Sequence, residues 1–153
     1  MTATDHAPTG TDRTSNHRQG AARAWLQAGV LAAALSVAAN LVVLAAARAA
    51  DASMVVVDGG TSAEITAASV ATSSAVPVIV GLVVVALLAL RWSATVRLAQ
   101  VVGGAFALLS VAGPLAADTD GGTAAALAIM HVVVGGAFVL ALEVARRQAV
   151  APR

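Results

Sequence analysis

Four long stretches of this 153-residue sequence contain no Asp, Glu, Lys or Arg. They cover residues 24–47, 65–90, 98–117 and 121–142, and they are 24, 26, 20 and 22 residues long. A helix of about 20 residues is about 30 Å long, which matches the thickness of the hydrocarbon layer of a bilayer. Each stretch is therefore long enough to cross a membrane as a helix.

A water-soluble bundle is the main alternative, and the composition argues against it. Helices of a soluble bundle carry charged or polar residues along one face, at every third or fourth position. None of the four stretches has such a face, and 59% of all residues are hydrophobic while only 11% are charged. Helices that are apolar on all sides belong in lipid. We predict an all-α fold, a bundle of four transmembrane helices in contact with the lipid bilayer.

The organisation of the chain follows from these stretches. Residues 1–23 are polar and lack apolar periodicity, which predicts a disordered cytoplasmic tail. Residues 24–147 form the membrane domain, and residues 148–153 form a second short cytoplasmic tail. The expected spans are residues 24–47, 70–90, 98–117 and 124–145. A cleaved signal peptide is disfavoured for the first span, because signal peptides have apolar cores of only about 7 to 15 residues.

The arginines predict the orientation in the membrane. All nine basic residues are Arg, and Arg48 is the one that would lie outside if both termini were cytoplasmic. The other eight would then lie on the cytoplasmic side, which is the distribution that the positive-inside rule expects. We therefore expect a multi-pass protein of the plasma membrane with both termini cytoplasmic.

In this orientation the segment between the first two spans, residues 48–69, lies outside. It contains a short apolar run, residues 54–57. Three interpretations stay open: a short strand, a loop that lies on the membrane surface, or a lid over the outer mouth of the bundle.

Small and polar side chains predict which helix faces pack together. Helices in lipid gain little from burying apolar surface against each other, so close contacts favour small residues and hydrogen-bonding groups. Each expected helix carries such a stripe at helical spacing. The expected packing residues are Gly29, Ala33, Gly81, Gly103, Ala107 and Gly135. Two small-residue motifs would also permit contact with a second copy or with another membrane protein. They are the series Ala99, Gly103, Ala107 and the pair Gly135-Gly136.

Depth singles out three polar residues. Asn40, Ser110 and His131 each lie seven residues from the outer end of their expected span, hence about 10 Å below the outer boundary. We expect them to form one polar layer inside the bilayer. The layer either satisfies its own hydrogen bonds or forms a site for a ligand or a proton. The first alternative is favoured, because the nearest intramembrane acid, Glu143, lies 12 residues further along the same helix, about 18 Å away.

The remaining composition limits the function. The chain has no cysteine, so it has no disulfide, no thiolate metal site and no redox-active cysteine pair. The four stretches contain one histidine, whereas a haem held between two histidines needs two. The net charge of +1 provides no basic surface for nucleic acid. We expect no catalytic residue, cofactor or metal, and favour a non-enzymatic packing or accessory component of the membrane over a small-solute or proton-coupled transporter built around His131 and Asn40.

Three short motifs resemble those of a known group of proteins. They are Asn40-Leu41-Val42-Val43, the segment LLSVAGPL at residues 108–115, and Met130-His131-Val132-Val133-Val134-Gly135. The chain resembles the small four-helix membrane proteins of actinobacteria that are classed as a domain of unknown function, over residues 24–146. The resemblance implies four spans and a plasma-membrane location, and it implies no activity.

Overall fold

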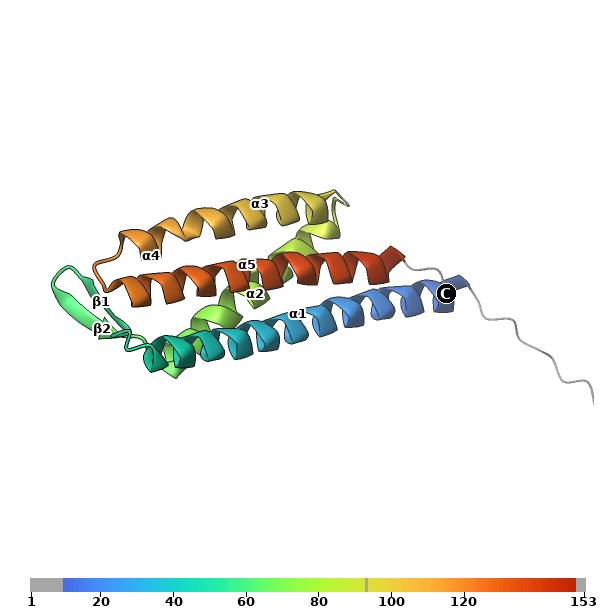
Figure 1. The fold of residues 1–153 in the computed structure, drawn as a ribbon. Helices are drawn as coiled ribbons and strands as arrows, with labels where there is room; N and C mark the ends of the chain where they lie inside the picture. The colour runs from blue at the N-terminus through green and yellow to red at the C-terminus, as the bar shows by residue number, and fades with distance from the viewer. Residues whose placement is uncertain (1–9, 93, 151–153) are drawn as a thin grey trace, which may run out of the picture.

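The computed structural model describes residues 10–92 and 94–150, which form a helical bundle with a small β-hairpin at one end (Figure 1). The elements, in chain order, are α1 (Gly10–Ala49), β1 (Val55–Asp58), β2 (Thr61–Glu64), α2 (Ala67–Ala89), α3 (Thr95–Ser110), α4 (Ala112–Ala116) and α5 (Gly121–Val150).

Four helical segments are long and apolar enough to cross a membrane. They are Ala22–Ala49, Ala67–Ala89, Thr95–Ala116 and Gly121–Gln148. The predicted helical bundle with four candidate spans is therefore confirmed, and the chain is a multi-pass membrane protein. The end that carries the hairpin is called the outer end below, and the opposite end the inner end, after the orientation that the arginines predict.

The predicted amino-terminal tail differs from the structure. Residues 1–23 were expected to be disordered, but α1 already begins at Gly10, so residues 10–23 are helical. Adding residues to an existing helix costs much less than nucleating a new one, and the long apolar part of α1 supplies the nucleus. Residues 1–9 of the expected tail lie outside the described residues. At the other terminus α5 continues to Val150, and residues 151–153 of the second expected tail also lie outside.

The third span consists of two helices. α3 ends at Ser110, and the short α4 follows after Val111 and contains Pro114. Proline has no backbone N–H, so Pro114 cannot donate to the carbonyl of Ser110, four residues earlier, and its ring crowds that carbonyl. The interruption of the helix lies where this effect of Pro114 is expected.

The helices have unequal numbers of neighbours. α1 packs against α2 and α5, whereas α3 packs mainly against α5. Figure 1 shows α5 between α1 and α3, and α2 crossing obliquely so that its last turns lie beside the start of α3. The buried apolar residues form two clusters. The inner one includes Ala33, Val78, Leu82 and Leu142, and the outer one contains Leu44, Met54, Val70, Ala126 and Met130.

Candidate functional site

Small residues let the helices interlock around one aromatic ring. A Cβ atom added to Gly81 on α2 would lie 2.7 Å from Cε2 of Phe138, and one added to Gly103 on α3 would lie 2.5 Å from Cε1 of the same ring. The Phe138 side chain of α5 therefore fills the space left by two glycines on two other helices. A Cβ atom at Gly135 would overlap the Cβ of Ala107 on α3. These contacts place Gly81, Gly103, Ala107 and Gly135 in helix interfaces.

The two remaining packing residues of the sequence analysis lie on α1. Ala33 is buried in the inner cluster. Gly29 faces α2, since an added Cβ would lie 3.4 Å from Cδ1 of Leu82. The six residues therefore serve contacts within the chain, and the motifs at Gly103 and Gly135 are occupied by the neighbouring helices. Gly136 differs, because nothing lies within 4 Å of a Cβ added there.

A buried polar group separates the inner from the outer apolar cluster. It consists of Ser36 and Asn40 on α1 and Ser74 on α2, and we call it the polar junction. All three side chains are buried. Asn40 Nδ2 donates to Ser74 Oγ at 2.8 Å and lies 3.3 Å from the carbonyl oxygen of Met130 on α5. Ser74 Oγ donates to the carbonyl of Val70 on its own helix. Asn40 thus connects three helices in the apolar interior.

The polar junction is not fully satisfied. Among the described residues, Ser36 Oγ and Asn40 Oδ1 are buried and have no hydrogen-bond partner. Buried polar atoms are normally paired with protein or with ordered water. These two atoms are one helical turn apart on α1, and they present a hydroxyl group and an amide oxygen to the same region of the interior.

The predicted layer of Asn40, Ser110 and His131 is not joined by hydrogen bonds. His131 Nδ1 donates to the carbonyl of Leu127 at 2.8 Å, and Ser110 Oγ donates to the carbonyl of Ala107 at 2.7 Å, so both side chains bond to their own helices. The physical reason is helix order. Helical spacing gives the face on which a residue lies but not the neighbour of that face, and Ser110 lies on the span that packs on α5, with α5 between it and α1.

Depth could have identified the actual partner of Asn40. Ser74 lies seven residues after Ala67, the first residue of α2. It therefore has the depth that singled out the other three polar residues. The sequence predicts a start of this helix near residue 70, whereas α2 begins at Ala67, and this difference hides the match. The early start is fixed by a capping box, in which Thr66 Oγ1 accepts from the N–H of Ser69 and Ser69 Oγ accepts from the N–H of Thr66.

The outer end of the bundle is closed by an ordered unit. We define the outer cap as residues 50–66 with residues 117–123. β1 and β2 pair antiparallel with Val56 opposite Ala63 and Asp58 opposite Thr61. The turn between them places Gly59 at φ +55° and Gly60 at φ +82°, a conformation that favours glycine at both positions. Of the three interpretations of residues 48–69, the structure contains the short strand, as part of this hairpin.

Asp120 fastens the hairpin to the start of α5. Its Oδ1 accepts from the N–H of Thr123, which caps the helix. Its Oδ2 accepts from Ser53 Oγ at 2.5 Å, from the N–H of Ser53 at 3.1 Å and from Thr123 Oγ1 at 2.6 Å. Thr123 Oγ1 in turn accepts from the N–H of Met54 at 2.9 Å. One carboxylate therefore holds two segments that are 67 residues apart in the sequence.

These bonds also change the acidity of Asp120. The hydroxyl of Ser53 contributes most, followed by the hydroxyl and the N–H of Thr123, and together they hold the pKa of the carboxyl well below its ordinary value of 3.8. Donors that stabilise a carboxylate disfavour its protonation. Asp120 is therefore charged at every physiological pH, and its bonds are strongest in that form.

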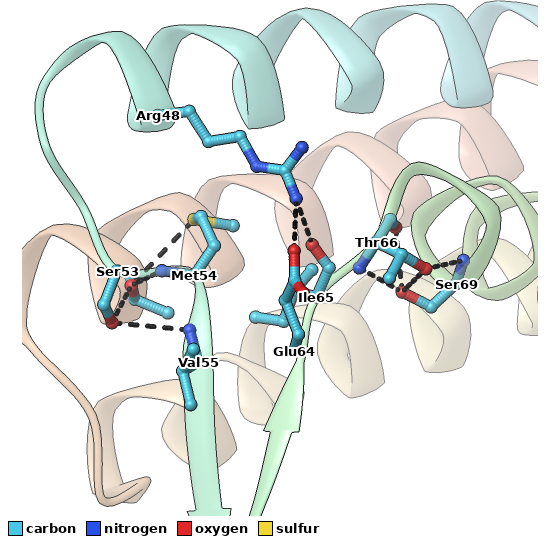
Figure 2. Close-up of polar contacts among 9 residues, drawn as sticks. Arg48, Ser53, Met54, Val55, Glu64, Ile65, Thr66 and Ser69 are labelled. Carbon is cyan, nitrogen blue, oxygen red and sulfur yellow. Dashed lines mark hydrogen bonds and ion pairs between the residues drawn. The ribbon is translucent and has the colours of Figure 1, made fainter.

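Further contacts hold the two sides of the hairpin (Figure 2). Arg48 Nη2, in the last turn of α1, donates to Glu64 Oε1 at 3.1 Å and to the carbonyl of Ile65 at 3.0 Å. On the side of β1, the N–H of Val57 donates to the carbonyl of Asp118 at 3.0 Å. Met54 is 1% exposed and anchors the base of the hairpin in the outer apolar cluster. The cap is thus fixed on both strands.

The comparisons with known proteins give the family. A model described as a family of unknown function, DUF6069, matches residues 20–148. The chain belongs to the DUF6069 family. The matched region contains the four candidate spans of this DUF6069 protein together with its outer cap. Searches of curated proteins and of solved structures found no match.

The polar groups of this DUF6069 protein that could bind a ligand or a partner lie in two places. The polar junction offers two unpaired buried oxygen atoms inside the bundle. The outer cap offers backbone and side-chain polar groups at the outer surface. No group of three or more His, Cys, Asp or Glu residues with metal-binding geometry occurs in the described residues.

Proposed function

We propose that this protein is a non-enzymatic accessory component of the plasma membrane of an actinobacterium, with both termini cytoplasmic, and that it uses its outer cap to bind another membrane protein. The observation that carries the proposal is the free edge of β2. Every residue of this strand is exposed. The bundle would act as a platform that holds the strand at the membrane surface.

The helix faces that could bind a partner inside the membrane are already occupied. The small-residue motifs at Gly103 and Gly135, which would otherwise suit a partner helix, contact Phe138 and Ala107 of the same chain. Binding through them would require opening the bundle. The outer cap does not have this restriction, because its hairpin extends beyond the ends of the helices (Figure 1).

The pattern of backbone hydrogen bonds between β1 and β2 leaves the outer edge of β2 free for a partner. Ile65 N–H donates to the carbonyl of Met54, so in this antiparallel pair the next bonded pairs are Val56 with Ala63 and Asp58 with Thr61. The backbone groups of Ser62 and Glu64 therefore point away from β1. In the described part of the chain they have no hydrogen-bond partner, which permits an extended segment of another protein to add to the sheet.

Transport is the weaker alternative. The unpaired atoms of Ser36 and Asn40 provide polar groups in the interior. A path to the inner end would have to pass the inner cluster, in which Val78 and Leu142 are 0% exposed. Replacing His131 with Gln tests this alternative in reconstituted vesicles, since a proton-coupled route through His131 would lose its flux.

Site-specific photocrosslinking in native membranes tests the proposed contact. A crosslinking residue in place of Ala63 on β2 should give an adduct of one defined mass above the monomer. The same residue in place of Ala105, an exposed alanine on the lipid-facing side of α3, is the matched control and should give none.

A second variant connects the adduct to the geometry of the cap. Asp120→Ala removes the carboxylate that holds Ser53 and Thr123, and it should lower the yield of the adduct at Ala63 while the protein remains in the membrane. An adduct at Ala105 with none at Ala63 would place the partner within the bilayer and contradict the proposal. Monomer alone at both positions would also contradict it.

A further inference from the structure

The inner half of the bundle contains a large apolar groove that the proposed function does not use. Its volume is about 1220 Å³, more than the roughly 300 to 1,000 Å³ of small-molecule sites. Trp25 of α1 and Ala86 of α2 line it from the two helices, and Gly29 and Leu82 line it where the two helices meet. The groove is not enclosed, and in a multi-pass protein at this depth its opening faces the acyl chains of lipid.

The groove has the length of one leaflet. Its wall on α2 runs from Ile79 to Leu90, which is about 16 Å along the helix axis at about 1.5 Å per residue. Half of the hydrocarbon layer is about 15 Å thick. An extended acyl chain of a lipid in the inner leaflet therefore has the right length to lie along it.

The charged residues that line the groove are both arginines, at its inner end. Arg97, at the start of α3, makes no hydrogen bond or ion pair with any residue that the structure describes, so the donors of its guanidinium group are available. Arg146 of α5 donates through Nε and Nη2 to Glu143, which leaves its other donors. Glu143 also accepts from Arg147, so this group of three carries a net charge of +1. The inner end of the groove is therefore positive.

We propose that the groove binds one anionic phospholipid of the inner leaflet, with its phosphate at Arg97 and Arg146 and its acyl chain along α1 and α2. The planar guanidinium group of Arg97 can donate two parallel hydrogen bonds to a phosphate. Trp25 lines the groove, and its ring suits the region between headgroups and acyl chains. This site is separate from the outer cap, and the two proposals can fail independently.

Native mass spectrometry of the detergent-purified protein tests the site with two defined lipids. The protein is mixed with equal amounts of a phosphatidylglycerol and a phosphatidylcholine that have the same acyl chains. One phosphatidylglycerol should be retained in preference to phosphatidylcholine. Arg97→Gln should lower that preference about fivefold, the effect expected for one basic residue at an anionic surface. Arg91→Gln is the matched control, because Arg91 is exposed at the same end but does not line the groove, and it should leave the preference within about twofold.

A second pair of variants tests the walls of the groove. Ala86→Phe fills it and should lower retention of both lipids, whereas Ala105→Phe, on the exposed side of α3, should not. Equal retention of the two lipids by the unaltered protein would overturn the proposal. So would a preference that Arg97→Gln leaves unchanged. A lipid-free dimer that Ala86→Phe converts to monomer would also overturn it, because a second copy would then occupy the groove.

Discussion

The outer and inner halves of this bundle are held together in different ways. In the outer half, polar groups connect the segments: Asn40 bonds to α2 and lies close to the backbone of α5, and Asp120 binds the hairpin to α5. Further in, the helices interlock by shape, with Phe138 between Gly81 and Gly103. The outer end is closed by a cap, whereas the inner end leaves an apolar groove of about 1220 Å³.

The difference reflects the two forces available to helices in lipid. Burying an apolar side chain against a neighbouring helix gains little there, because lipid is equally apolar. Hydrogen bonds and close van der Waals contacts remain. Hydrogen bonds join particular pairs of residues. In this protein those of Asn40 and Asp120 lie in the outer half, which the cap closes. Close van der Waals packing needs only matching surfaces. It predominates in the inner half, where the groove between α1 and α2 with its two arginines remains open.

The largest expected effect comes from breaking the interlocked part. Gly135→Leu places a side chain where Ala107 already lies, and overpacking of this kind should destabilise the bundle by about 3 kcal/mol or more. Gly136→Leu is the matched control, because the adjacent position is open. Thermal unfolding in detergent measures both variants. Equal melting temperatures would contradict the assignment of the Gly135 face.

A smaller effect is expected from the polar junction. Asn40→Leu and Ser74→Ala, alone and together, form a double-mutant cycle for the 2.8 Å hydrogen bond between the two side chains. The coupling should be about 0.6 kcal/mol, the average for hydrogen bonds between helices in a membrane, and should not exceed about 1.7 kcal/mol. A cycle of Asn40→Leu with Ser110→Ala should give a coupling near zero. Coupling of Asn40 with Ser110 but not with Ser74 would contradict the polar junction and support the layer that the sequence predicts.

The smallest effect is confined to the outer cap and depends on pH. The folded pKa of Asp120 lies below its ordinary value of 3.8, so its carboxylate stabilises the cap fully above about pH 4. That contribution should disappear as the pH falls from about 4 toward the folded pKa, where Asp120 becomes protonated. The amide resonances of Gly59 and Gly60 should report the loosening of the hairpin while the helices persist. Asp120→Asn should remove this response, and its survival in that variant would assign it to another group.

Much of the fold could be predicted because lipid imposes a simple rule. A charge inside a span is costly, so the charge-free stretches of the sequence mark the four spans. Small residues at helical spacing likewise identified Gly81 and Gly103, which lie against Phe138. The ring itself was not predicted, since a phenylalanine on a transmembrane helix faces lipid as readily as it faces a neighbour.

Other features depend on tertiary contacts that no local pattern specifies. The order of the helices decided that Asn40 meets Ser74 rather than Ser110. The hairpin did have a local signal, since Asp58-Gly59-Gly60-Thr61 follows a run of valines and is typical of a tight turn between strands. Its attachment through Asp120 had none, because Ser53 and Asp120 are 67 residues apart.

Labelling of single cysteines can show whether the protein is a four-span bundle with its cap outside and its termini inside. The chain has no cysteine of its own, so each introduced thiol reports one position. With a membrane-impermeant thiol reagent on intact cells, Ser62→Cys in β2 should react, Ala94→Cys between α2 and α3 should react only after permeabilisation, and Leu35→Cys in the middle of α1 should not react. Reaction of Ala94→Cys in intact cells with protection of Ser62→Cys would invert the orientation. Full reaction of Leu35→Cys would contradict the membrane bundle itself.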